Sequence, residues 1–310
     1  DVRDRALRWF ADAYGGEASV VEASSREYWF NVRVESETRF ATIRVHRVTG
    51  RVDPLNVWLR PEYVSRIAEQ SLGMRAVSVD LDGDVYWVML EGPDRYAAVE
   101  VDAETGDFRG SHERRIVEVS KITVDALRRR VPLTDWAMTS IAPESPHDLL
   151  IELKASGGKA LVKYDVVSGK IVDVDVAISR EGAIQLASAE FPGFRIKEVR
   201  EAKLGYTVVM EGETLEADVL VSLSGDVSVP DRRWKRAYAE KLAVEAWREK
   251  YGVRPEVTEA RLESEWEVEG WLEGWHYRAW VQRAGKGVKV SRMASRDLAE
   301  RIARAWVRSS

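Results

Sequence analysis

The 310-residue sequence contains no cysteine, which excludes disulfides, thiol nucleophiles and thiolate metal sites. Histidine is nearly as scarce, and its four copies lie too far apart in the sequence to suggest a metal site: His46, His112, His147 and His276. No run approaches the roughly 18 apolar residues of a membrane-spanning helix. No nucleophile–base pair stands out, and no GxSxG elbow is present. We therefore expect no catalytic residue, no bound metal and no cofactor.

Side-chain amides are also rare, with two Asn and three Gln, while 32% of the residues are charged. This combination is typical of proteins from hot habitats. The net charge is −5 and both signs are interspersed, so the basic face of a nucleic-acid binder is missing. The basic clusters at 128–130 and 232–236 are interpreted as solvated helix faces. The sequence starts at Asp1 without a visible signal peptide, which favours an exported protein whose leader was removed or a trimmed chain.

A repeated hairpin organises the rest of the sequence. Each copy reads as a strand, a small residue, a Gly and a second strand, as in YAAVEVDAETGDFRG and ALVKYDVVSGKIVDVDV. A tight hairpin turn requires a positive φ, which Gly adopts without steric cost. The predicted turn glycines are Gly50, Gly106, Gly169, Gly225 and Gly287, spaced by 56, 63, 56 and 62 residues.

Two further strands precede each hairpin strand, and a helix with an apolar stripe opens each copy. Pro61, Thr123 and Ser179 are expected near the starts of the second, third and fourth helices, and Gly252 at the end of the fifth. The predicted fold is α+β: tandem repeats, each with one helix packed on a small antiparallel sheet of three strands and a short fourth one. The expected boundaries are 1–59, 60–120, 121–177, 178–230 and 231–293, followed by an extra helix in 294–310.

These repeats resemble the PepSY family. Residues 98–109, AVEVDAETGDFR, match the family's strand, Asp, Thr-Gly and short strand best, and residues 161–172 match with Ser in place of Thr. The fifth copy departs from the pattern, with Lys286-Gly287 in place of Thr-Gly. The resemblance spans nearly the whole chain as five tandem copies. It implies extracytoplasmic, non-enzymatic modules, which in the family occur in peptidase propeptides and in tandem in cell-surface proteins.

The tail AERIARAW at 299–306 is similar to AEKLAVEAW at 239–247, in the fifth helix. The chain thus begins a sixth helix, which Ser295 can cap. Its apolar stripe consists of Leu298, Ile302, Ala305 and Trp306. This helix is either a cap that packs on the fifth repeat or a docking element for another chain.

Two acidic segments have the composition of cation-binding sites. DLDGD at 80–84 has calcium-loop spacing but lacks the required Gly at the sixth position, so a hairpin tip at Asp82-Gly83 explains it better. Alternating glutamates at 263–269 form an acidic strand face, read as solvated or as a site for a cation or a basic partner. His147 beside Asp148 is interpreted as a surface histidine.

Seven of the 12 tryptophans follow residue 230. Trp275 is predicted on the same strand face as Tyr277, and Trp280 on the opposite one. One face can fill the core, while the other needs packing between repeats or a protein partner. The candidate interaction residues are Trp271, Trp275, Trp280, Leu298, Ile302 and Trp306.

The sequence therefore predicts a non-enzymatic, extracellular or cell-surface scaffold that binds other proteins or copies of itself. It predicts no nucleic-acid partner and no transmembrane segment. Peptidase inhibition, as in a propeptide, is the alternative function.

Overall fold

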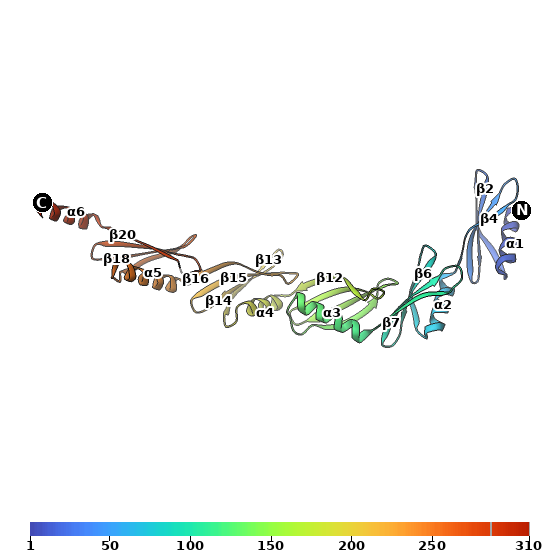
Figure 1. Cartoon of the computed structure of the whole chain (residues 1–310), viewed down its shortest axis with the longest axis horizontal. Coiled ribbons are helices and arrows are strands. Elements are labelled where there is room, and N and C mark those ends of the chain that lie inside the picture. The colour runs from blue at the N-terminus through green and yellow to red at the C-terminus, as the bar shows by residue number, and fades with distance from the viewer. Residues whose placement is uncertain (286, 310) are drawn as a thin grey trace. The chain divides into compact units, whose positions relative to one another are not determined.

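The computed structural model describes residues 1–285 and 287–309. The chain forms five repeats, each a helix followed by a four-stranded antiparallel sheet, and one further helix (Figure 1). The predicted α+β repeat fold is confirmed. Lys286 of the predicted fifth turn and Ser310 of the tail lie outside the described residues.

The helices and strands recur in the same order. Repeat 1 contains α1 (Val2–Tyr14), β1 (Ala18–Arg26), β2 (Trp29–Ser36), β3 (Arg39–His46) and β4 (Val52–Leu59). Repeat 2 contains α2 (Pro61–Leu72), β5 (Arg75–Asp82), β6 (Val85–Glu91), β7 (Arg95–Asp102) and β8 (Phe108–Arg115). Repeat 3 contains α3 (Ile116–Arg130), β9 (Ala137–Pro143), β10 (Asp148–Ala155), β11 (Gly158–Asp165) and β12 (Lys170–Ile178). Repeat 4 contains α4 (Arg180–Glu190), β13 (Arg195–Ala202), β14 (Gly205–Glu211), β15 (Leu215–Ser222) and β16 (Val227–Trp234). Repeat 5 contains α5 (Arg236–Tyr251), β17 (Glu256–Leu262), β18 (Trp266–Leu272), β19 (Trp275–Val281) and β20 (Val288–Ala294), and α6 (Arg296–Ser309) follows it.

Each sheet is a meander in which consecutive strands pair, so the first and fourth strands form its edges. The first pair carries a register shift in every repeat, for example between Val20 and Glu22 and between Ala76 and Ser78. Such bulges bend and twist a strand. The fourth strands have seven to nine residues, as many as the others, so the prediction that they are short is wrong.

The apolar stripes of α1, α2, α4 and α5 are each buried against the sheet of the same repeat. In repeat 1, Ala6 and Phe10 are fully buried, and in repeat 2 Val64 and Ala68 are. In repeat 5 the fully buried helix residues are Ala239, Ala243 and Trp247. Alternate strand residues face these helices, as the period of two requires.

The turn chemistry follows the sequence prediction at four positions. Gly50, Gly106, Gly169 and Gly225 have φ angles between 69° and 91°. Pro61 stands in the first turn of α2, Ser179 caps α4, and Gly252 ends α5 in the left-handed conformation. The prediction is wrong at the fifth position: Gly287 does not have a φ in the left-handed region, and the positive φ falls on Gly285, at 156°.

The third helix begins earlier than predicted. It starts at Ile116, directly after β8, and Thr123 lies inside it as a fully buried residue. The Thr123 hydroxyl donates to the carbonyl of Val119 at 2.9 Å, which a helix-interior Thr does when no polar partner is near. Thr123 is therefore not a cap. The predicted boundary at residue 120 lies inside α3, and the one at 230 lies inside β16.

One main-chain hydrogen bond starts the helix that follows every sheet. The N–H of the residue after the fourth strand donates to a carbonyl in the turn between the second and third strands. The five donor–acceptor pairs are Arg60–Thr38, Ile116–Asp94, Ser179–Gly157, Lys235–Thr214 and Ser295–Gly274, at 2.8–3.0 Å. Because this bond points into the sheet, the N–H of the preceding residue points away from it.

That outward N–H joins consecutive repeats at three junctions. Leu59 donates to the carbonyl of Ala103 at 2.7 Å, Ile178 to Leu223 at 2.8 Å and Trp234 to Arg283 at 2.7 Å. Each acceptor lies in the hairpin turn of the next repeat. Between repeats 2 and 3 a side chain bridges instead, since Arg114 Nη2 donates to the carbonyl of Val167 at 3.2 Å.

The outward carbonyl of the same residue is used as well. The Tyr86 hydroxyl donates to the carbonyl of Leu59 at 2.8 Å, and the Trp266 indole to that of Trp234 at 3.0 Å. Burial raises the pKa of Tyr86 to about 12, so its hydroxyl stays protonated well into the alkaline range. Leu59 also belongs to the apolar core of repeat 2, and Trp234 packs against that of repeat 5.

Candidate functional site

Repeat 5 and α6 carry all the predicted interaction residues, and the strand faces separate the tryptophans as expected. Trp275 and Tyr277 both pack in the core cluster beneath α5. Trp280 lies on the opposite face, half-buried, with the Arg278 guanidinium 5.8 Å from its ring centre. Trp271, at the end of β18, is 43% exposed. On the outer face, Trp271 is therefore the more exposed indole, whereas Trp275 is part of the core of repeat 5.

The open indole is stacked on a histidine. The rings of Trp271 and His276 are 4.6 Å apart and inclined by 19°. His276 Nε2 lies 3.2 Å from the Glu269 carboxylate, which also accepts from Arg278 at 2.9 Å. Burial opposes ionisation of Glu269, but these two partners outweigh it and hold its pKa below the usual range.

Two of the four glutamates in the acidic face predicted at 263–269 are neutralised by an arginine on the neighbouring strand. Glu267 and Glu269 both form ion pairs with Arg278 of β19, at 3.1 and 2.9 Å. Glu263 and Glu265 lie outside β18, in the turn that precedes it. Within residues 1–285 and 287–309, no three His, Asp or Glu side chains are grouped as metal ligands.

The other sequence candidates have structural surroundings of their own. Residues 80–82 are the end of β5, and Gly83 and Asp84 form the tip of the β5–β6 hairpin. Gly83 has a φ of 64°, and Asp84 pairs with Arg109 at 2.8 Å. His147, predicted at the surface, is half-buried. Its ring lies edge-on to Trp87 at 4.7 Å, and its carbonyl accepts from the Val166 N–H.

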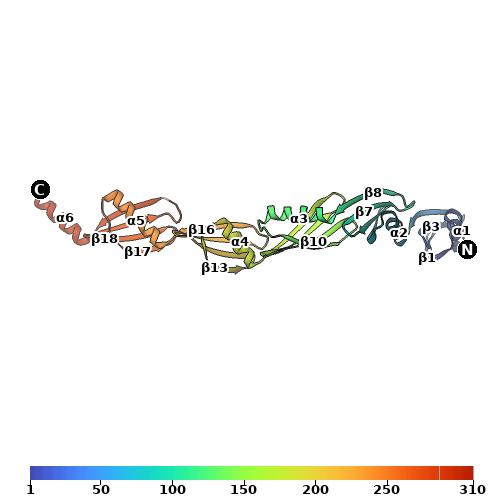
Figure 2. The same cartoon turned by 90° about the horizontal axis from the view of Figure 1, so that it is seen from below.

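Helix α6 lies beyond the end of the repeat-5 sheet in both views (Figures 1 and 2). Ser295 caps it, because its hydroxyl accepts the Leu298 N–H at 3.2 Å. Leu298 lies next to Gly274, with its Cβ 3.4 Å from where a Gly274 side chain would begin. Ile302 is 48% exposed and Trp306 72% exposed. The first turn of α6 is thus anchored, and its later apolar residues face solvent.

Comparison with α5 shows what this exposure means. When the sequences of the two helices are aligned with a shift of 60 residues, Ala239 matches Ala299 and Ala243 matches Ala303. Both α5 alanines are fully buried under their sheet, whereas Ala299 and Ala303 are exposed. Helix α6 therefore has the composition of a helix that a sheet covers, with no such sheet in the described chain.

A second unused group lies at the start of α6. Ala294 ends the edge strand β20, and Ser295 makes the inward bond to Gly274. The Ala294 N–H consequently points outward, as those of Leu59, Ile178 and Trp234 do. Within residues 1–285 and 287–309, no acceptor takes it. This donor was not found from the sequence, because its direction depends on the strand register.

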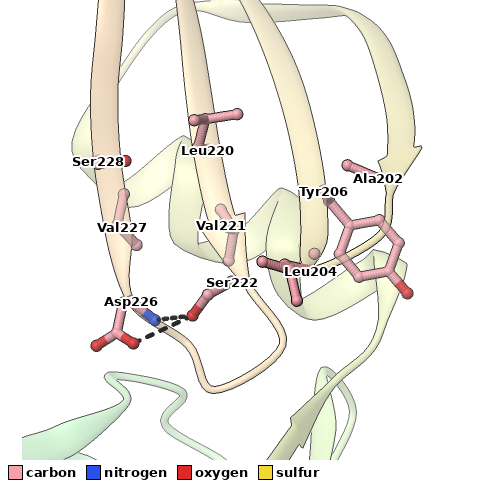
Figure 3. A pocket seen from close by; sticks show the side chains of 10 residues that line it. Ala202, Leu204, Tyr206, Leu220, Val221, Ser222, Asp226, Val227 and Ser228 are labelled. Carbon is pink, nitrogen blue, oxygen red and sulfur yellow. Dashed lines mark hydrogen bonds between the residues drawn. The ribbon is translucent and has the colours of Figure 1, made fainter.

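A hollow of about 310 Å³ in repeat 4 also escaped the sequence analysis (Figure 3). Leu204, Leu220 and Val227 form its apolar walls, and Leu204 is 77% exposed. At its rim, hydrogen bonds from the Ser224 and Ser222 hydroxyls lower the pKa of Asp226. Ser222 and Asp226 belong to its lining, and the Ser222 hydroxyl donates to the Asp226 carboxylate at 3.2 Å.

No family model matches this chain, and no curated protein matches it. Among solved structures, it is similar to the Bacillus megaterium YpeB C-terminal domain, with 10% identity and a TM-score of 0.17 over 77% of this chain and 99% of that one. The Listeria monocytogenes protein lmo1340 has 7% identity and a TM-score of 0.17 over 90% and 66% of the two chains. The Clostridium difficile protein CD1622 has 16% identity and a TM-score of 0.16 over 35% and 90%. At these TM-scores the likenesses assign neither fold nor function.

None of the helices in the described part of the chain combines the length and apolar character needed to cross a membrane.

Proposed function

We propose that this protein is a non-enzymatic, extracytoplasmic scaffold of PepSY-like modules that binds other protein chains, copies of itself included. The exposed alanines of α6 are the observation that carries the proposal. Ala299 and Ala303 occupy positions that are fully buried in α5, and Ile302 and Trp306 extend the same exposed surface. A contiguous apolar stripe of this kind is typical of a protein-binding site.

Two features support a structural role. Main-chain bonds join neighbouring repeats at three junctions and the Arg114 side chain joins repeats 2 and 3, so neighbours stabilise one another as in other repeat proteins. The ionisable groups of the outer face in repeat 5 are engaged with one another, as Glu269, His276 and Arg278 illustrate. The extracytoplasmic location rests on the PepSY resemblance.

The test compares molar masses by light scattering. We expect the intact chain to associate with rising concentration, and a chain without residues 296–310 to remain monomeric with an unchanged melting temperature. Ile302→Glu should weaken association in the same way, because it places a charge in the apolar stripe. Arg301→Ala, beside it on the polar face, is the control and should have no effect. Equal masses for the intact and shortened chains would contradict the proposed role of α6.

A further inference from the structure

A cleft of about 320 Å³ in repeat 1 is lined by α1, by the edge strand β4 and by the hairpin turn of repeat 2. We propose that this cleft binds a neutral glycan, with pyranose rings stacked on the indoles of Trp9 and Trp58. Its volume is at the lower end of small-molecule sites, which measure roughly 300–1,000 Å³. The inference goes beyond the proposed function and does not depend on it, since it places a carbohydrate site on repeat 1 whether or not the chain associates.

The two tryptophans are peculiar to repeat 1. Each of the helices α1 to α5 has a pair of buried positions four residues apart, such as Ala6 and Phe10, which aligns the repeats with one another. The residue directly before the second position is Trp9 in repeat 1, and it is aliphatic in repeats 2 to 5: Ile67, Ile122, Leu186 and Leu242. The penultimate residue of the fourth strand is Trp58 in repeat 1, and in repeats 2 to 5 it is Arg114, Ala177, Arg233 and Met293. Because an aliphatic residue meets the packing needs of these helices, the tryptophan pair indicates a role of repeat 1 alone.

Both indoles are held in place by the cores of the repeats. Trp9 packs against the apolar core of repeat 1, and Trp58 against that of repeat 2. Each is only half-buried and also lines the cleft, so part of its ring system is open to a ligand. An aromatic platform that packing has already fixed loses little conformational entropy on binding.

Polar groups with unused hydrogen-bonding capacity line the same cleft. Asn56 Oδ1 accepts the Thr42 N–H at 3.1 Å, which leaves the amide nitrogen of Asn56 to donate to a ligand. Within residues 1–285 and 287–309, the Glu104 carboxylate forms no ion pair and accepts no hydrogen bond. A pyranose combines a face of C–H groups with a rim of hydroxyls that both donate and accept. Aromatic faces beside one free donor and one free acceptor therefore fit it.

An extended peptide fits the cleft less well, because β4 is a poor edge for strand pairing. Pro54 has no N–H, and the register shift between Thr42 and Ile43 leaves Leu55 as an extra, bulged residue. Prolines and bulges both hinder the addition of a further strand.

A cationic ligand is also disfavoured, because Arg39 already supplies a positive charge beside the cleft. Its guanidinium lies 4.9 Å from the centre of the Tyr14 ring, and its Nη1 donates to the Glu104 carbonyl at 2.6 Å. A neutral ligand avoids this repulsion and can still use the Glu104 carboxylate as an acceptor.

Calorimetric titration with four neutral β-1,4-linked hexasaccharides tests the site, using those of glucose, N-acetylglucosamine, mannose and xylose. We expect at least one of them to bind with a dissociation constant of roughly 10 µM to 1 mM, as suits a small open site with few contacts. If none of the four binds at millimolar concentration, the proposal is overturned.

Two substitutions locate the binding. Trp9→Ile and Trp58→Arg introduce the residues that repeat 2 has at these positions, so both variants should fold, which their melting temperatures check. Each should weaken binding about tenfold or more, and each reports on the site independently of the other. Tyr28→Ala removes a 66% exposed aromatic side chain of repeat 1 outside the cleft and should leave the dissociation constant unchanged. Glycan binding that survives both tryptophan substitutions would show that this cleft is not the site.

Glu104→Gln and salt distinguish a glycan from a cation. An amide oxygen can replace the carboxylate as acceptor, so glycan affinity should change by less than about fivefold. Added salt should have little effect, because no charge is bound. A hexalysine peptide that binds where the glycans do not, and that is lost in Glu104→Gln or in high salt, would identify a cation site and overturn the proposal.

The two proposals can fail separately. Trp9→Ile and Trp58→Arg should leave the molar mass of the intact chain unchanged at every concentration, because α6 is untouched. A chain that does not associate but binds a hexasaccharide through Trp9 contradicts the scaffold function alone, and one that associates but binds none contradicts the glycan site alone.

Discussion

Gly157 and Gly182 lie so close together that neither has room for a side chain. A Cβ on Gly182, in the first turn of α4, would be 1.9 Å from the Gly157 carbonyl oxygen. That oxygen also accepts the Ser179 N–H that starts the helix. The close approach fixes α4 onto the β10–β11 turn through backbone atoms, which cannot yield as a flexible side chain does.

Gly182→Ala should therefore destabilise the protein despite the better helix propensity of Ala. The propensity gain is at most about 1 kcal/mol, while overpacking against rigid backbone costs about 1–3 kcal/mol. Chemical denaturation measures the free energy of unfolding. Glu190→Ala, at the exposed end of the same helix, is the control and should stay within about 0.5 kcal/mol. A Gly182→Ala variant as stable as the natural chain would contradict this packing.

Gly106→Val should destabilise repeat 2 by more than about 1 kcal/mol, because a β-branched residue is strained at positive φ. The φ of Gly106 is 83°, and Leu59 leaves only 3.0 Å to the new Cβ. Gly110→Ala is the matched control, since φ there is not positive and its nearest neighbour would be 3.5 Å away. An unchanged thermal melt for Gly106→Val would argue against the hairpin turn.

Asp102 should make stability depend on pH in the acid range. The N–H of Thr105 and the guanidinium of Arg109 hold the pKa of Asp102 at about 2, below its usual 3.8. A lowered folded-state pKa stabilises the protein above the unfolded value and is lost as pH falls through the folded one. Asp102→Asn should therefore lower the unfolding free energy at pH 7, and the difference should shrink between pH 4 and pH 2. Glu104→Gln, a neighbour whose side chain makes no hydrogen bond to the turn, should show no such trend.

Divalent ions should not affect stability. The acidic segment at 80–84 belongs to the β5–β6 hairpin, and Asp84 is already paired with Arg109. We expect the same melting temperature in excess chelator as in added calcium. A marked drop on chelation would show that the carboxylates hold a cation.

Peptidases of the thermolysin and subtilisin types should retain full activity in the presence of micromolar protein. This assay addresses the alternative function directly, because a propeptide-like inhibitor would act at this concentration. Tight inhibition of either enzyme would favour that function over the scaffold.

The local features of this protein were determined by its sequence. Turns at Gly50, Gly106, Gly169 and Gly225 could be predicted because positive φ selects Gly. The cap at Ser179 and the helix end at Gly252 were predictable because they satisfy backbone groups only a few residues away. The faces of Trp275 and Trp280 followed from strand alternation alone.

The contacts between repeats were decided by the tertiary structure. Whether an N–H points into its sheet or away depends on register, so the outward donors at Leu59 and Ala294 could not be read from residue identity. The place of Thr123 also depended on the tertiary structure, because a residue that looked like a helix cap is fully buried inside α3. Likewise, the alternating glutamates looked like a free acidic face until β19 placed Arg278 opposite them. A sequence specifies what each residue can bond, whereas the packed sheets decide which partner comes within reach.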